Sequence, residues 1–322
     1  MAAVLLTASV SFCGEPGSIE AIVGGLEPAS AYRAQLRETL RGFPEPDVVS
    51  VILEHLETDP RFHDRTLRSI AYGLLDDFHA EKTPEGLAQL LTGLKEHGYG
   101  ANALGRLGSN PPPGVVEALG NRLVTGPSDG QDPVVRSLGA YKELSLPYFD
   151  AVAAVLERKD LEYPSRFTAA KALVAIGGIE KALEKFRNDD ADAATEKIVL
   201  NAVGYWGLQT WGTYNADESV RQTLKRRTLS GLKHPDRDVR NAAMEATFVG
   251  PYNMEIAVKG ADGRWTLNPE VAEALRYMAT NDPDEKLRAK ALLGLNDDYT
   301  RLGEKIERNR KKMEKPVPAT QP

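Results

Sequence analysis

Apolar residues recur at helical spacing along most of this chain. The first clear stripe consists of Val48, Val49, Ile52, Leu53 and Leu56, which fall on one face of a helix. Asp59 and Pro60 then mark a turn, because proline does not continue a helix. The same spacing predicts further helices around residues 64–78, 84–97 and 99–108. Since Pro and Gly cluster between such stripes, the pattern predicts an all-α protein.

A phrase with the chemistry of a helix start, Asp-x-x-(Val/Leu)-Arg-x-x-(Ala/Gly), recurs at Asp132, Asp236 and Asp284. Asp is a favoured N-cap, because its carboxylate accepts the free amide hydrogens of the first turn. A fourth segment keeps the Arg, as Arg166, but lacks the Asp. Small residues follow three and six places after the Arg and let a neighbouring helix approach closely: Ala169 and Ala172, Ala243 and Ala246, Ala291 and Gly294.

The spacing of the phrase predicts repeated helical hairpins. Consecutive copies, with a degenerate one led by Lys197, lie about 30 to 33 residues apart once two insertions are set aside. These insertions are the Gly- and aromatic-containing stretch 207–216 and the non-helical stretch 251–268. Each unit has room for two helices of ordinary length and two short turns.

The Arg of the phrase returns once per unit at the same height of the predicted stack. Each Arg can therefore reach the Asp of the next unit, which predicts a structural ladder along the stack. We favour this structural role over ligand binding for the residues concerned, which are Asp132, Arg136, Arg166, Asp236, Arg240, Asp284 and Arg288.

On this phrase and spacing, residues 114–298 resemble tandem HEAT repeats, in the short form found in bacterial HEAT and phycobilisome-lyase-like proteins. Residues 46–110 are similar to the same family more weakly. The resemblance implies a right-handed α-α superhelix, a HEAT-like solenoid, over residues 19–298, with a small β-hairpin in the insertion 251–268. Members of the family are mostly protein-interaction scaffolds, while some are enzymes or nucleic-acid binders.

Composition narrows the function classes. The chain has 322 residues and a net charge of −6, which disfavours a non-specific nucleic-acid binder. It contains no apolar run near the ~18–20 residues that a membrane span needs. Its single cysteine excludes an internal disulfide framework.

The two ends of the chain differ in character. Residues 1–18 combine an apolar run with a flexible linker and resemble an export signal, with Cys13 where a lipoprotein would be acylated. No basic residue precedes the run and Phe12 is large for that position, so a frayed cytoplasmic N-terminus with a buried Cys13 is the alternative; we lean slightly towards export to the cell envelope. Residues 299–315 predict a polar helix that caps the stack, rather than a basic arm, and residues 316–322 a disordered tail.

Motif searches give no catalytic site and no cofactor. The chain lacks the nucleophile elbow, the P-loop, the dinucleotide fingerprint and the zinc-protease motif. A HEAT-like oxygenase family binds iron through His-Glu pairs, but this chain has only the reversed order, at Glu54-His55 and Glu96-His97. His55, His63, His79 and His97 match no metal-ligand spacing, so we interpret them as surface or boundary residues.

Two features suggest binding. Tyr205, Trp206, Trp211 and Tyr214 form an aromatic cluster, and such side chains often anchor interfaces; the alternative is that they seal a gap between repeats. In the insertion, residues 254–259 and 264–267 flank a Gly-containing turn and predict a β-hairpin that leans on the stack through Trp265 and Ile256.

The sequence therefore predicts a non-catalytic scaffold that binds another protein, with Tyr205, Trp206, Trp211, Tyr214 and Trp265 as candidate contacts. An enzyme or nucleic-acid-processing protein that uses the concave face is the alternative. A basic groove would favour nucleic acid as the partner, whereas an apolar or acidic groove would favour protein.

Overall fold

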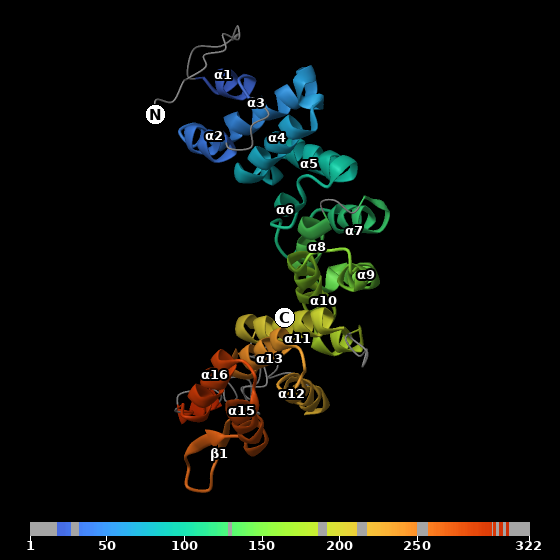
Figure 1. Cartoon of the computed structure of the whole chain (residues 1–322). Coiled ribbons are helices and arrows are strands. Elements are labelled where there is room, and N and C mark those ends of the chain that lie inside the picture. Colours follow the sequence, from blue (N-terminus) through green and yellow to red (C-terminus); the bar gives the residue numbers. More distant parts are fainter. Residues whose placement is uncertain are drawn as a thin grey trace, which may run out of the picture. The chain divides into compact units, whose positions relative to one another are not determined.

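A computed structural model gives a mostly helical chain with one small antiparallel sheet (Figure 1). This confirms the predicted helical class and the predicted hairpin. The chain divides into two compact units, residues 1–145 and residues 146–322. The structure describes residues 18–26, 32–127, 131–185, 192–210, 218–249, 257–297, 299–300, 303–304 and 307–308.

The described part of the first unit is built from helices and two 3-10 turns. In chain order these are α1 (Ile19–Gly24), α2 (Tyr32–Leu40), α3 (Glu45–Thr58), α4 (Arg65–Asp77), α5 (Pro84–His97), α6 (Ala101–Leu104), α7 (Val115–Thr125) and α8 (Gln131–Ala140), with 3-10 turns at Pro60–His63 and Ala80–Lys82. The predicted stripe on α3 faces the core, because Val48, Val49, Ile52 and Leu56 are all buried. The helix predicted at 99–108 is shorter than expected, since α6 ends at Leu104 and its cap is Gly105.

The second unit contains helix pairs that pack along the chain. It comprises α9 (Phe149–Glu157), α10 (Tyr163–Lys185), α11 (Ala193–Thr210), α12 (Glu218–Gly231), α13 (Arg237–Val249), β1 (Ala257–Lys259), β2 (Trp265–Leu267), α15 (Pro269–Asn281) and α16 (Glu285–Leu295), preceded by a 3-10 turn at Lys142–Tyr148. The main packed pairs are α9 with α10, α10 with α11, α11 with α13, α12 with α13, and α15 with α16.

Two glycine-containing stretches behave differently from each other. Gly178 has φ 74° and ψ 170°, so it breaks α10 into two helical segments. The Gly- and aromatic-containing stretch 207–216, by contrast, begins inside a helix, because α11 continues through Thr210. Gly204 and Gly207 thus lie inside a helix, where propensity alone disfavours them.

The repeated phrase has a fourth complete copy, which starts at Asp64 and ends at Ala71. Its Asp caps α4, accepting from the amides of Thr66 at 2.9 Å and Leu67 at 3.1 Å. Asp236 caps α13 and Asp284 caps α16 in the same way. The N-cap role predicted for the Asp therefore holds at these positions, and Asp132 instead lies inside the first turn of α8.

The hairpin pairs Ala257 with Leu267 and Lys259 with Trp265. Its turn needs a left-handed residue, which Gly263 supplies with φ 79°. The Trp265 ring lies against Gly303, where an added Cβ would sit 1.9 Å from the ring atom Cδ2. The hairpin thus contacts the segment after α16, whereas the sequence predicts a contact with the repeat stack; Ile256, the other predicted contact, lies outside the described residues. Among the described helices, none is long and apolar enough to cross a bilayer.

Candidate functional site: an apolar groove between α13 and α16

The groove lies between two helices that carry copies of the repeated phrase. In each of them the small residues after the Arg are buried: Ala243, Ala246, Ala291 and Gly294. An added Cβ on Gly294 would lie only 2.3 Å from Cζ of Phe248. Glycine at this position therefore lets the Phe248 ring of α13 come close to the backbone of α16.

A buried ion pair joins the beginnings of the two helices. Arg240 of α13 donates from Nε to Oδ2 of Asp282 at 2.8 Å and from Nη2 to Oδ1 at 3.2 Å. The exposed fractions of the two side chains are 8% and 1%. The same guanidinium donates to the carbonyls of His234 and Pro235, so it clamps the turn before α13 as well. Such a network fixes the geometry on which the groove depends.

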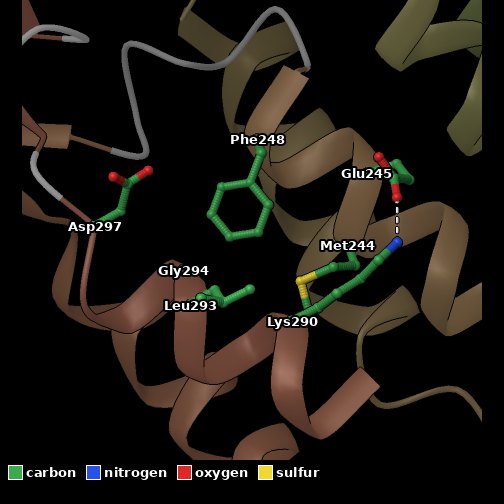
Figure 2. A pocket seen from close by; sticks show the side chains of 7 residues that line it. All are labelled: Met244, Glu245, Phe248, Lys290, Leu293, Gly294 and Asp297. Atoms are coloured by element: carbon green, nitrogen blue, oxygen red, sulfur yellow. Dashed lines mark hydrogen bonds and ion pairs between the residues drawn. The ribbon is translucent and has the colours of Figure 1, made fainter. Parts of the chain in front are cut away.

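The groove has a volume of about 400 Å³ (Figure 2). Its walls are Met244, Glu245 and Phe248 from α13, and Lys290, Leu293 and Gly294 from α16, with Asp297 just after that helix. Figure 2 shows the Phe248 ring in the middle, between the two helices, with the Lys290–Glu245 pair on one side and Asp297 on the other. The volume is at the lower end of the range for ligand pockets, about 300–1,000 Å³.

One apolar side chain at the edge of the groove is highly exposed. Leu293 is 73% exposed, the highest value among the large apolar side chains of the described part of the chain. Leu292 beside it is 50% exposed but does not line the groove. Met244, at the base, is buried and Phe248 is partly buried. Leu293 and Phe248 thus present apolar surface that water covers in the free protein.

The charged groups sit at the two ends of the groove. Lys290 donates from Nζ to Oε1 of Glu245 at 2.5 Å and to Oδ1 of Asn241 at 3.1 Å. At the other end, burial and the negative charge of Asp297 raise the pKa of Tyr299 to about 12. The Tyr299 hydroxyl donates to the carbonyl of Gly294, which ties the segment after α16 to the groove wall.

The aromatic residues predicted as partner contacts lie elsewhere. Tyr205 and Trp206 are on α11, and their side chains are outside the described part of the structure. Trp211 and Tyr214 are likewise outside the described residues. Trp265 packs against Gly303 and does not line the groove. Whether these rings bind a partner stays a prediction.

The phrase arginines make contacts that differ from the predicted ladder. Arg136 pairs with Asp132 of its own helix at 2.7 Å. Arg166 donates to the carbonyl of Leu156 and to Oγ1 of Thr195. Arg240 does reach forward to the next repeat, but to Asp282, two residues before the expected Asp284. Asp284 itself pairs with Arg237.

Most complete copies of the phrase share one hydrogen bond, from the arginine side chain to a backbone carbonyl. Arg68, Arg240 and Arg288 each donate to the backbone carbonyl six residues earlier, which belongs to Phe62, His234 and Asp282 respectively. The arginine thus closes the turn that precedes its own helix. This bond satisfies carbonyls that a helix end or turn would otherwise leave without a partner.

Other polar clusters in the first unit form structural networks. Arg106 pairs with Asp76 and with the buried carboxylate of Glu81, which also contacts His79. Arg33 binds Asp77 and the carbonyl of Gly73. Within the described residues, no group of three or more His, Cys, Asp or Glu side chains is placed to hold a metal ion.

The sequence does contain a signal for the groove. In α16, Leu287, Ala291 and Gly294 form the buried face. Adjacent helical residues point about 100° apart, so Leu292 and Leu293 cannot both join that face. Two neighbouring leucines outside the buried face therefore indicate an exposed apolar surface that a partner can cover. The residues that α13 contributes to the groove are identified only by the structure.

No protein-family model matches the chain, and a search of curated proteins found no similar sequence.

Proposed function

We propose that this protein is a non-catalytic scaffold of the HEAT type, a right-handed α-α solenoid, that binds another protein. The partner inserts an apolar segment into the groove between α13 and α16. The observation that carries the proposal is the 73% exposure of Leu293 on the rim of an apolar groove of about 400 Å³. Exposed apolar surface rimmed by polar residues is typical of protein-interaction sites.

The repeated geometry supports the HEAT part of the proposal. Copies of the phrase far apart in the chain use the same Asp cap and the same arginine-to-carbonyl bond. Helical units with the same local contacts and sequential packing are the building blocks of solenoids. In such a stack, binding surfaces are made by neighbouring helices, as they are here by α13 and α16.

The charge of the groove favours a protein partner over a nucleic acid. Its lining holds the two carboxylates of Glu245 and Asp297 and the single ammonium of Lys290. Nucleic-acid grooves concentrate arginine and lysine, because phosphates supply much of the affinity. The walls around these charges are apolar, which suits a helix or an extended segment with apolar side chains.

A selection experiment tests the proposal without knowledge of the natural partner. The full-length chain is used to select from a phage-displayed library of random peptides, and the selected peptides are measured against L293D. We expect L293D to weaken their affinity at least about tenfold, since a carboxylate would be buried against Phe248 and Met244.

Leu292 offers a matched control for this selection. It is the neighbouring exposed leucine but lies outside the groove lining, so L292D should leave the affinity within about twofold. If no peptide is enriched, or if L293D binds as well as the wild type, the proposed function is wrong.

A further inference from the structure

The groove lies at one end of a row of polar side chains that crosses neighbouring helices of the second unit. Lys290 of α16, which lines the groove, donates from Nζ to Oδ1 of Asn241 at 3.1 Å and to Oε1 of Glu245 at 2.5 Å, both on α13. Asp238 of α13 in turn accepts from Nζ of Lys197 on α11 at 2.7 Å. None of these five side chains is buried. Together they form a polar strip that joins α16 to α13 and α13 to α11.

An exposed aromatic side chain lies at the far end of the polar strip. Nζ of Lys197 is 5.3 Å from the ring centroid of Tyr163 at the start of α10, and the Tyr163 hydroxyl accepts from Nδ2 of Asn201 on α11 at 2.8 Å. The same ring stacks on Phe167, with centroids 5.6 Å apart and an interplanar angle of 14°. Tyr163 is nevertheless 39% exposed. Its ring is thus a fixed surface of the kind that anchors protein interfaces.

We propose that Tyr163 and Phe167 form a second anchor site for the partner segment that occupies the groove. That segment is an extended stretch of a partner protein, with an apolar side chain at each end and polar residues between them. One end lies over Leu293 in the groove and the other over Tyr163. This inference rests on the proposed function and adds the length and the residue pattern of the partner to it.

The polar strip suits the middle of an extended segment. Each of its two ammonium groups contacts a carboxylate of α13, so charge is balanced along the strip. Asn241 within the strip and Asn201 beside it carry carboxamides, which have both donors and acceptors. An extended chain offers its backbone N–H and C=O groups to such side chains, whereas a helix pairs these groups internally. The apolar ends of the segment therefore supply most of the affinity.

The helices that lie between the two anchors set the length of the segment. Helix α10 packs against α11, α11 against α13, and α13 against α16. Packed helices lie about 8–10 Å apart, so three such steps separate the anchors by roughly 25–30 Å. An extended chain advances about 3.3 Å per residue, so the two apolar side chains of the partner are about eight to nine residues apart.

Selection from a phage-displayed library of random peptides about 16 residues long, on the full-length chain, tests the inference. We expect the enriched peptides to share two apolar positions about eight to nine residues apart. Each peptide is then synthesised in its selected form and with either apolar position replaced by alanine, and binding is measured by fluorescence anisotropy.

The two anchors should be separable in this experiment. Y163A should weaken the selected peptide about tenfold, because it removes one of the two anchors. A peptide that has already lost the apolar position for this anchor should bind Y163A and the wild type within about twofold of each other, yet should still be weakened by L293D. Tyr277 is a matched control, because it is 54% exposed but lies on α15. Y277A should therefore leave the affinity within about twofold.

A photo-crosslinking measurement gives the same information without a variant of the chain. A benzophenone side chain at the second apolar position of the peptide should label α10 in the wild type. Enriched peptides with a single apolar position, equal effects of Y163A on the selected and the alanine-substituted peptides, or labelling outside α10 overturn the second anchor alone.

Two further outcomes reach beyond the second anchor. If the wild-type chain is a dimer that Y163A and L293D both dissociate, the occupant is a second copy of this chain and the inference is wrong. If no peptide is enriched, or if L293D binds the peptides as well as the wild type, the proposed function fails as well.

Discussion

Arg240 and Arg136 occupy the same position of the same phrase, yet their surroundings differ. Arg240 is buried, with Asp282 on one side and two backbone carbonyls on the other. Arg136 is 63% exposed and pairs only with Asp132 among the contacts that the structure gives it. A buried charge is costly when its partner is removed, whereas an exposed pair contributes little. The phrase thus predicts a helix start, whereas burial determines how much its arginine contributes to the free energy of unfolding.

This contrast gives a first prediction for the free energy of unfolding. R240Q should lower it by about 3–5 kcal/mol, because Asp282 would remain buried without its partner. R136Q should change it by less than about 1 kcal/mol, since its pair is screened by water. Denaturant unfolding followed by circular dichroism measures both. Equal losses for the two variants would show that burial is not the deciding factor.

A second prediction concerns the acid stability of the first unit. Hydrogen bonds from the Arg61 side chain, followed by those from its backbone amide, lower the pKa of Asp59 from 3.8 to about 2. A carboxylate with a lowered pKa stabilises the fold above its unfolded pKa, and this stabilisation is lost as pH falls through the folded value. Asparagine can still cap the turn at this position, so D59N mainly removes the charge.

Unfolding measured between pH 5 and pH 2 tests this account. The difference in unfolding free energy between the wild type and D59N should be largest above about pH 4 and should diminish towards pH 2. In an R61Q background, Asp59 lacks its main hydrogen-bond partner. The unfolding free energies of R61Q and of the double variant R61Q/D59N should therefore depend on pH in nearly the same way. A difference between wild type and D59N that stays constant with pH would contradict this role of Asp59.

At the scale of helices and strands, the sequence predicts much of the structure. The stripe on α3, the caps at Asp236 and Asp284 and the hairpin around Gly263 follow from periodicity and turn chemistry. One predicted helix is too long, because the helix expected at 99–108 ends at Leu104, where Gly105 caps α6.

The contact between α13 and α16 gives a prediction at this scale. G294A gains helix propensity worth about 1 kcal/mol, but its methyl group collides with the Phe248 ring. Overpacking of this kind costs about 1–3 kcal/mol, so the variant should be neutral to destabilised and should bind selected peptides more weakly. Thermal unfolding and peptide anisotropy report the two effects.

A double variant checks the cause of this effect. F248L shortens the side chain that G294A displaces, so the combined change should cost less than the sum of the two single changes. Additive losses would indicate that Gly294 and Phe248 do not act through a shared contact.

At the scale of the whole molecule, the same phrase occurs in both units. A copy of the phrase in α4 and copies in α13 and α16 build the same Asp cap and the same arginine-to-carbonyl bond. The sequence could indicate the repeats, because capping and small residues act locally. It could not assign arginine partners or the groove, since these depend on which side chains of distant helices meet. The right-handed superhelix remains part of our proposal.

The central claim is that a partner segment binds between α13 and α16. Hydrogen–deuterium exchange of the full-length chain, with and without a selected peptide, tests it most directly. We predict slower exchange in residues 241–249 and 287–297 on binding, and no such protection in L293D. Peptide binding that protects α11 around Tyr205 and leaves α13 and α16 unchanged would contradict the claim.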